Sequence, residues 1–355
     1  MVTPASGTPP VKVLVVDDSA FMRFTITKHL NEFSGITVLG AAKDGREALD
    51  MIPKLKPDVV TLDVEMPNLD GLSTLREIMS RHPLPVVMLS SLTSEGTLET
   101  VRALTLGAVD FVAKPDNKAN MASILEEVGN KVLRAAKAKV WQTPAKSAYI
   151  ETAPTARVLE KKVRSLRNQD KIVVIGSSTG GPRALNTVVP MLDASIPAAF
   201  VIVQHMPAGF TRSLSERLNG TSELYVKEAA PDDRLEVGKI LLAPGGFHMV
   251  FDENEKVTLN QNPTVHGVRP AVDVTLLSIV KLYGPRVVTA ILTGMGNDGT
   301  NAALMVHNSG GWVISEAEET CVVYGMPRSV YEAGASNEVV PLDRVAEAIK
   351  AAVGR

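Results

Sequence analysis

Short apolar runs alternate with helix-length segments along most of the chain. From Val11 onward these runs read VKVLVVDD, ITVLGAA, PDVVTLDV, LPVVMLSS and AVDFVAKP. Five such strands separated by helical patterns are typical of a parallel sheet that helices cover on both faces. The first domain is therefore predicted to be an α/β domain with a five-stranded parallel sheet over residues 11–130.

The alternation stops after this domain. The stretch AAKAKVWQTPAKSAYIETAPTARVLEKKVRSLRNQD mixes Ala, Pro, Thr and Lys without a sustained apolar period. This composition predicts a linker over residues 131–169 with short helical pieces at most. Its basic character leaves two interpretations, a solvated tether or a segment that docks an acidic partner.

The β/α rhythm resumes after Asp170. Its apolar runs are KIVVIGSS, AAFVIVQHM, KILLAPG, HMVFDENEKVTLN, RVVTAILTG and GGWVISEAEE. They predict a second doubly wound α/β domain over residues 170–355, with a mostly parallel sheet and a hairpin-like insertion near residues 247–260.

Composition narrows the class of protein. Apolar residues make up 45% of the 355 residues, charged residues 21%, and the formal net charge is -2. These values are typical of a globular protein without a strongly basic surface, so nucleic acid is not a favoured partner. The only cysteine is Cys321, so no internal disulfide can form. With no apolar run of about 18 residues and no leader-like start, we expect a cytoplasmic protein without direct membrane insertion.

Acidic residues gather at the strand ends of the first domain. Asp17 and Asp18 end the first apolar run, Asp63 lies near the end of the third, and Lys114 ends the fifth. In an open parallel sheet the carboxyl ends of the strands share one edge, where ligands bind. Clustered carboxylates repel each other, and Mg²⁺ relieves that repulsion. Singly, each residue has an ordinary explanation as a helix cap, a turn acid or a solvated charge.

The second domain opens with KIVVIGSSTGGPRAL, an apolar run that ends in serines and glycines. A glycine-rich turn before a helix can bind phosphate, but the spacings of a dinucleotide site and of a P-loop are absent. Gly176, Ser178 and Gly180 fit G-x-S-x-G, which exposes a serine hydroxyl on a sharp turn with backbone amides nearby. The motif alone is a weak signal.

A nucleophilic serine needs a base and an orienting acid. His205 stands at the carboxyl end of the next predicted strand, and Asp298 follows a later strand in the glycine-rich stretch LTGMGNDGT. Asp273 competes with Asp298 as the acid, but it is better explained as an acidic residue in the first turn of a helix. The order Ser, His, Asp differs from the order in α/β-hydrolases.

These motifs carry a resemblance to known families. The strand-end acids and Lys114 resemble the flavodoxin-like receiver domain of bacterial response regulators. This resemblance implies that Asp63 is the phospho-acceptor, that Asp17, Asp18 and Asp63 hold Mg²⁺, and that Lys114 pairs with the phosphoryl group. It also implies that Ser90 and Phe111 are the switch positions, although Phe111 lacks the hydroxyl of the tyrosine often found there.

With the receiver and the linker, the motifs GSSTGG, QHMPAGFT, LAPGG and LTGMGNDG resemble the chemotaxis protein-glutamate methylesterases of the CheB family. The resemblance implies Ser178 as nucleophile, His205 as base and acid, and Asp298 as orienting carboxylate. Thr179 and the backbone amide of Met295 fall at positions associated with the oxyanion hole. Ser177 stands where the family often has Ala.

By the same resemblance, the activity is phosphorylation-activated hydrolysis of glutamyl methyl esters on methyl-accepting chemotaxis receptors, with release of methanol and deamidation of receptor glutamines. A chemotaxis histidine kinase is the expected phosphodonor, and ester hydrolysis needs no cofactor. A nucleotide- or protein-binding output module without hydrolysis is the alternative, and the absent phosphate-loop spacings disfavour it. A DNA-binding output is less favoured still, because the second half shows no basic helix-turn-helix pattern.

Overall fold

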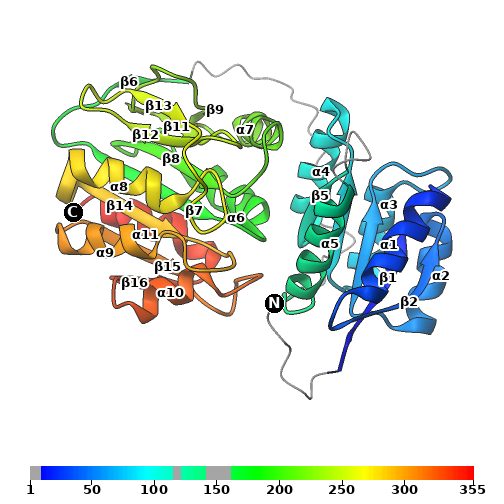
Figure 1. The fold of residues 1–355 in the computed structure, drawn as a ribbon. Helices are drawn as coiled ribbons and strands as arrows, with labels where there is room; N and C mark the ends of the chain where they lie inside the picture. Colours follow the sequence, from blue (N-terminus) through cyan, green and yellow to red (C-terminus); the bar gives the residue numbers. More distant parts are fainter. Residues whose placement is uncertain (1–8, 115–120, 141–160) are drawn as a thin grey trace. The chain divides into compact units, whose positions relative to one another are not determined.

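The computed structural model describes residues 9–114, 121–140 and 161–355. The chain forms two compact units whose limit falls at residues 150 and 151, outside the described residues. Most of the predicted linker, 141–160, likewise lies outside them. We therefore describe each unit by itself (Figure 1).

The first unit contains the predicted five-stranded parallel sheet, in the order β2-β1-β3-β4-β5. Helices α1 and α5 pack together on one face, and α2, α3 and α4 pack in sequence on the other (Figure 1). The elements are β1 (Val11–Val16), α1 (Ala20–Glu32), β2 (Ile36–Ala42), α2 (Gly45–Leu55), β3 (Val59–Asp63), α3 (Gly71–Arg81), β4 (Val86–Ser90), α4 (Ser94–Leu106), β5 (Asp110–Ala113) and α5 (Met121–Ala135). Helix α5 thus continues five residues beyond 130, where the domain is predicted to end.

The second unit contains a seven-stranded parallel sheet in the order β16-β15-β14-β7-β8-β11-β9. Its strands are β7 (Lys171–Ser177), β8 (Ala198–Gln204), β9 (Tyr225–Glu228), β11 (Lys239–Leu242), β14 (Val287–Ile291), β15 (Trp312–Glu316) and β16 (Glu338–Val340). The predicted hairpin is present as β12 (His248–Phe251) and β13 (Val257–Asn260). A further short pair, β6 (Arg164–Ser165) and β10 (Glu236–Val237), was not predicted.

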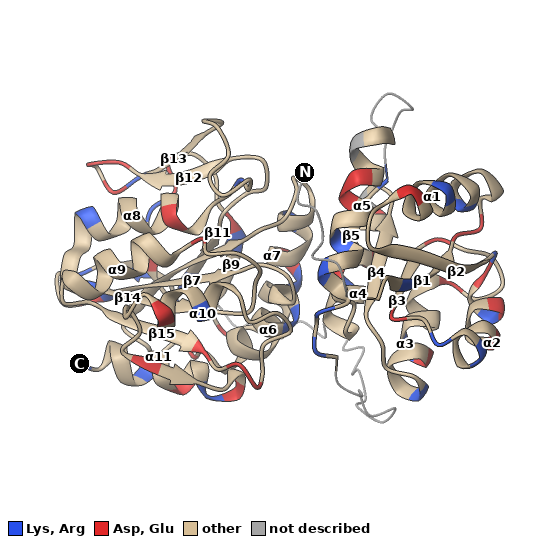
Figure 2. Ribbon diagram, turned by 60° about the horizontal axis from the view of Figure 1, so that its bottom comes forward, with Lys and Arg blue, Asp and Glu red and all other residues tan. Residues whose placement is uncertain are grey.

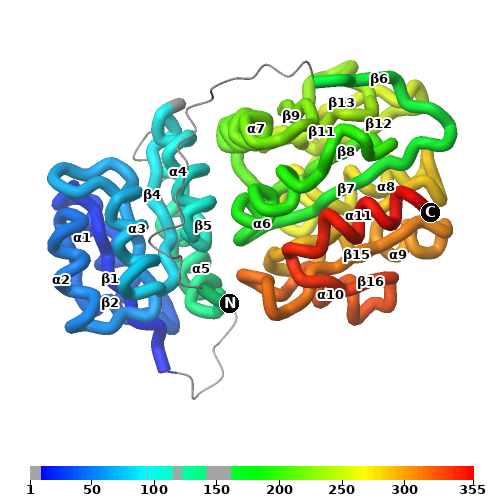
Figure 3. Tube along the Cα trace, turned by 180° about the vertical axis from the view of Figure 1, so that it is seen from behind, coloured from blue at the N-terminus to red at the C-terminus, as the bar shows by residue number. Residues whose placement is uncertain are grey.

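Helices cover both faces of this larger sheet. Helices α6, α7 and α11 lie on one face, seen in front in Figure 3, and α8 and α9 lie on the other, seen in front in Figure 1. Their bounds are α6 (Gly181–Val188), α7 (Phe210–Thr221), α8 (Val272–Tyr283), α9 (Thr300–Asn308), α10 (Met326–Glu332) and α11 (Val345–Val353), with 3₁₀ turns at Val189–Met191, Gly284–Arg286 and Leu342–Arg344. The main apolar core lies between the sheet and α8 to α10, and includes Val174, Val201 and Leu276.

The topology explains where a site should form. From β7 in the sheet centre, the chain first builds β8, β9 and β11 on one side and later returns to build β14, β15 and β16 on the other. The carboxyl end of β7 therefore lies at a topological switch point, where open parallel sheets leave room for ligands.

The two units begin their helices differently. In the first unit, side-chain oxygens of Ser19, Asp44, Asp70 and Thr93 accept hydrogen bonds from first-turn amides of α1 to α4. In the second unit, α6, α7 and α9 begin after glycines, without a side-chain cap on the preceding residue. At α6 and α9 the first amide donates instead to a backbone carbonyl three residues earlier, Gly181 to Ser178 and Thr300 to Asn297.

The distribution of charge and the character of the helices bear on the expected partners. Lysine and arginine occur together with aspartate and glutamate on each unit (Figure 2), consistent with the net charge of -2. Of the helices in the described ranges, none has the length and apolar character that crossing a bilayer requires.

Candidate active site and phosphorylation pocket

The strand-end acids of the first unit meet as predicted. Asp17 and Asp18 follow β1, and Asp63 is the last residue of β3. The ammonium of Lys114, just after β5, lies 2.6 Å from Asp63 Oδ2 and 3.0 Å from Asp17 Oδ2. Carboxylate oxygens of the three acids lie within 4.8 Å of one another. The sheet thus brings three acids and one base to one edge.

The net negative charge of this pocket favours binding of a cation. Burial raises the pKa of Asp63 to about 6, Lys114 opposes that shift, and Asp17 adds to it. Burial alone would lower the pKa of the Lys114 ammonium, but the two carboxylates hold it above its ordinary value. One lysine therefore compensates only part of the clustered negative charge.

The donor set fits a hard divalent cation. All three acids offer oxygen ligands, the type that Mg²⁺ prefers, and the exposed Asp18 leaves room for the waters that Mg²⁺ retains. The acidic cluster of Asp17, Asp18 and Asp63 is consistent with a metal site.

The two positions predicted to act as a switch, Ser90 and Phe111, are both buried. The Ser90 hydroxyl lies 3.1 Å from two acceptors, the carbonyls of Ser91 and Gly96, and accepts from the hydroxyl of Thr100 at 2.5 Å. Gly96 and Thr100 belong to α4. Phe111 is buried on β5, with the ammonium of Lys131 5.1 Å from its ring centroid. Both side chains thus have partners on neighbouring helices.

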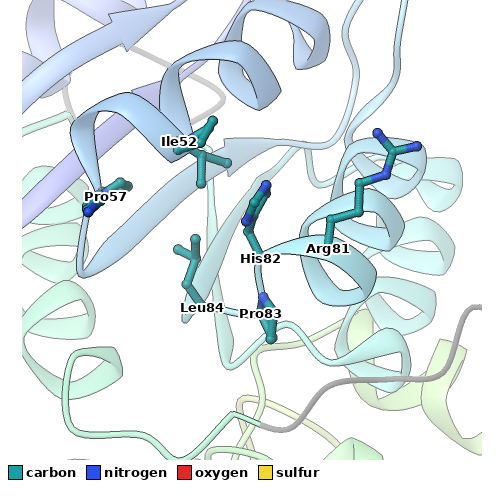
Figure 4. Close-up of a pocket in the computed structure, with 8 residues that line it drawn as sticks. Ile52, Pro57, Arg81, His82, Pro83 and Leu84 are labelled. Carbon is teal, nitrogen blue, oxygen red and sulfur yellow. The ribbon is translucent and has the colours of Figure 1, made fainter.

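A separate pocket of about 480 Å³ lies at the opposite edge of this sheet, where β3 and β4 begin (Figure 4). Its lining includes Ile52, Pro57, Arg81, His82, Pro83 and Leu84. None of the predicted site residues is among those that line it.

The serine turn of the second unit is a sharp connection between β7 and α6. β7 ends at Ser177, α6 begins at Gly181, and Ser178 is half-buried between them. Gly180 has a φ of 79°, and a Cβ on Gly181 would lie 1.9 Å from the Gln204 side-chain oxygen. Both positions require glycine, which explains why the turn carries two of them.

His205 lies directly beside this turn. It follows β8, and its amide donates to the carbonyl of Ser177 at 3.1 Å. Its Nε2 lies 2.7 Å from Asp298 Oδ2. Because an ionised carboxylate only accepts hydrogen bonds, Nε2 carries the proton in the neutral ring, and Nδ1 is free to accept one.

Asp298 is fixed by the start of α8. Its Oδ2 accepts from the Val272 amide at 2.6 Å, and its Oδ1 accepts from the Asp273 amide at 2.9 Å. Burial alone would raise the pKa of Asp298, but His205 and the two amides hold it below its ordinary value. The carboxylate therefore stays ionised and caps α8 from another loop.

Asp273, the other candidate for the acid, has different hydrogen-bond partners. Asp273 Oδ1 accepts from the Ala302 amide near the start of α9, and Asp273 Oδ2 lies 3.0 Å from His266 Nε2. Asp298, not Asp273, is the hydrogen-bond partner of His205.

The two predicted oxyanion positions flank Ser178. Thr179 is buried directly after it, whereas Met295 is 44% exposed in the loop after β14. A Cβ on Gly294 would lie 2.8 Å from Ser178 Cβ, so the backbone before Met295 runs close against the serine. Only glycine permits this approach.

Sequence reasoning missed Gln204, which ties the turn to His205. Its side-chain nitrogen donates to the carbonyls of Ser178 and His205 at 2.9 and 3.1 Å, and its oxygen accepts from the Ser177 hydroxyl at 2.7 Å. A polar residue at the end of the wholly apolar run AAFVIV was the available signal. Ser177 is fully buried, so its hydroxyl is a partner of Gln204 rather than an exposed group.

Comparisons with known proteins identify the family of each unit. Residues 173–349 match the family described as CheB methylesterase, and residues 13–126 match the response regulator receiver domain. A protein-glutamate methylesterase/protein-glutamine glutaminase of Symbiobacterium thermophilum is 50% identical, covering 97% of this chain and 98% of the relative. The relative of the same description from Thermotoga maritima is 43% identical, covering 95% and 97%.

A solved structure supports the fold of the second unit. The crystal structure of the Thermotoga maritima CheB methylesterase catalytic domain is 48% identical to the matching part, covers 51% of this chain and 98% of that chain, and has a TM-score of 0.50. Together with the full-length relatives, this match shows that the chain belongs to the CheB family of protein-glutamate methylesterases/protein-glutamine glutaminases, with an N-terminal response regulator receiver domain.

Proposed function

We propose that Ser178, His205 and Asp298 form the catalytic triad of this chain and hydrolyse glutamyl methyl esters on methyl-accepting chemotaxis receptors. The 2.7 Å contact between His205 Nε2 and Asp298 Oδ2, formed next to the serine turn, carries the proposal. An ionised acid that fixes the ring through Nε2 gives His205 one defined orientation and tautomer. Its Nδ1 is then the atom that receives the Ser178 proton.

The chemical steps follow from these roles. Ser178 Oγ attacks the ester carbonyl carbon of the receptor glutamate while its proton passes to His205 Nδ1. The tetrahedral intermediate collapses, the carbon–methoxy bond breaks, and His205 returns the proton so that methanol leaves. Water then attacks the acyl-enzyme with His205 as base, which releases the glutamate and restores Ser178. With a glutamine substrate, ammonia leaves in place of methanol.

The backbone beside Ser178 would stabilise the negative charge of the intermediate. We assign the oxyanion hole to the Met295 amide and Thr179. The close approach of Gly294 to Ser178 and the burial of Thr179 support this assignment. Deleting a comparable donor costs about 2.7 to 4 kcal/mol of transition-state stabilisation.

The receiver pocket would control this activity. We propose that Asp63 Oδ accepts a phosphoryl group from a chemotaxis histidine kinase or a small phosphodonor, and that Lys114 pairs with the added charge. Asp17, Asp18 and Asp63 would hold Mg²⁺, which supplies neutralisation of the phosphoryl oxygens. Ser90 and Phe111 are the proposed switch positions. Ser90 contacts Gly96 and Thr100 of α4, so a phosphoryl group that recruits its hydroxyl would change these contacts and link the pocket to that helix.

The proposal also concerns the compartment. The receptors and the kinase named above require this chain to work in the cytoplasm. Cys321, the only cysteine, is buried and forms no internal disulfide, which a reducing compartment permits.

Methanol release from methylated receptor membranes tests both parts of this function. Wild type, Ser178→Ala and Asp63→Asn are compared with and without Mg²⁺ and a small phosphodonor. We expect stimulated release by wild type, basal but unstimulated release by Asp63→Asn, and none by Ser178→Ala. Equal release by wild type and Ser178→Ala would remove Ser178 as nucleophile. No release by any of the three, combined with tight nucleotide binding, would favour a binding module.

A further inference from the structure

A buried polar group beneath the serine turn has no role in the proposed mechanism. Thr293 follows β14, and Glu316 is the last residue of β15; both are almost fully buried. The Thr293 amide donates to Glu316 Oε2 at 2.7 Å. A buried carboxylate is costly unless hydrogen bonds compensate for the lost water, so its presence here requires a reason.

Thr293 contacts the serine turn through two further groups. Its carbonyl accepts from the Ser178 amide, and its hydroxyl donates to the carbonyl of Thr179, each at 3.0 Å. The backbone of both residues is therefore fixed by one threonine.

The same threonine fixes the loop that carries Met295. Its hydroxyl accepts from the Val323 amide at 3.0 Å, and the carbonyl of Val323 accepts from the Gly294 amide at 3.0 Å. The carbonyl of Gly294 in turn accepts from the Met326 amide at 2.8 Å. The backbone on the N-terminal side of Met295 is thus held on both edges.

Glu316 is in turn held firmly. Its Oε1 accepts from the Thr320 hydroxyl at 3.0 Å, and Thr320 accepts from the Leu342 amide. Burial raises the pKa of Glu316, and its hydrogen bonds and the charge of Arg183 on α6 oppose that shift. The side chain has hydrogen-bond partners after β14 and after β15, which limits its movement.

We propose that Thr293, anchored by the buried carboxylate of Glu316, is a positioning residue that sets the distance between the Ser178–Thr179 turn and the Met295 loop. The inference rests on the proposed triad and oxyanion hole. Thr293 touches no reacting atom, so it acts only through the backbone that it holds. Displacements of about 1 Å at a reacting centre can cost about 100-fold in rate.

The test compares three full-length variants on methylated receptor membranes. Thr293→Val keeps the branched shape but loses the hydroxyl, and Thr293→Ser restores the hydroxyl. Thr289→Val is the matched control, because Thr289 is also fully buried on β14 and its hydroxyl donates to the Val174 carbonyl, away from the turn. We expect Thr293→Val to lower kcat about 10- to 100-fold with KM nearly unchanged, because the loss falls on the transition state.

The rescue and control variants have defined expected results. Thr293→Ser should recover most of the kcat, Thr289→Val should keep it within about twofold, and a serine-directed phosphonofluoridate should label Ser178 more slowly in Thr293→Val. A Thr293→Val kcat within twofold of wild type, a loss that Thr293→Ser does not restore, or an equal loss in Thr289→Val would overturn the proposal. Should Thr293→Val fail to fold, Glu316→Gln carries the same test, with the same split between kcat and KM expected. Ser178→Ala is measured alongside, because its activity alone decides the triad.

Discussion

Two buried aspartates at the ends of parallel strands have opposite electrostatic environments. Asp63 in the receiver is 3% exposed and Asp298 in the catalytic domain is 1% exposed. Yet the pKa of Asp63 is raised to about 6, whereas the pKa of Asp298 is lowered. Burial alone therefore does not decide the charge of a strand-end acid; its partners decide it.

The partners differ in kind. Asp298 accepts two amide hydrogen bonds at the start of α8 and a third from His205, all from groups fixed in the fold. Asp63 shares Lys114 with Asp17, and the second carboxylate opposes its ionisation. The negative charge of Asp298 is thus already stabilised by fixed hydrogen-bond donors, as catalysis by preorganised groups requires. The receiver pocket is left with excess negative charge, which a divalent cation would compensate.

The largest expected effect is the loss of activity when the negative charge of Asp298 is removed. Asp298→Asn should lower kcat about 100- to 10,000-fold, because an amide nitrogen facing His205 selects the wrong tautomer. Initial rates of methanol release measure it, with Asp273→Asn as the control for loss of a buried acid beside the same helix start. An Asp298→Asn enzyme within threefold of wild type would mean that the charge of Asp298 is not needed.

The next largest effect is a pH dependence of receiver stability that arises from Asp63. Because the pKa of Asp63 is about 6 in the folded state and about 4 in the unfolded state, the folded receiver binds the proton more tightly. The free energy of unfolding should therefore fall as pH rises from about 4 to about 6, by about 3 kcal/mol at most. Asp63→Asn should abolish this slope and stabilise the receiver above pH 6.

Hydrogen exchange of the β1 and β3 amides, corrected for intrinsic rates, measures this slope without Mg²⁺. Added Mg²⁺ should stabilise wild type above pH 6, because it binds the ionised carboxylates of the folded state. Asp63→Asn should respond less, since its neutral amide oxygen binds Mg²⁺ more weakly than a carboxylate does. An identical pH dependence in wild type and Asp63→Asn would show that other groups control receiver stability.

The sequence located both aspartates for the same reason. Each follows an apolar run that forms a central strand, so its position at the carboxyl edge follows from fold class alone. The five receiver strands, the central strands β7, β8, β14 and β15, and the hairpin all have runs long enough to recognise. The edge strands β9 and β16 read YVKE and EVV, and such short, partly polar runs carry little signal.

The opposite shifts of the two aspartates depend on contacts that sequence spacing does not encode. Asp298 obtains its amides from α8, 25 and 26 residues earlier in the chain. Thr293 meets Glu316 across 23 residues, and Ser177 meets Gln204 across 27. Side-chain hydrogen bonds of this range require the packed sheet, so neither these supports nor the pKa directions could be predicted beforehand.

The smallest expected effect comes from removing one hydroxyl group that supports the serine turn. Ser177→Ala removes a single buried bond to Gln204, whose amide nitrogen keeps both its carbonyl acceptors. One buried hydrogen bond contributes about 1 kcal/mol, so we expect slightly lower stability of the catalytic domain and a kcat within about fivefold of wild type. Phosphonofluoridate labelling should survive in Ser177→Ala and disappear in Ser178→Ala. Labelling that disappeared in Ser177→Ala but survived in Ser178→Ala would mean that Ser177, and not Ser178, is the nucleophile.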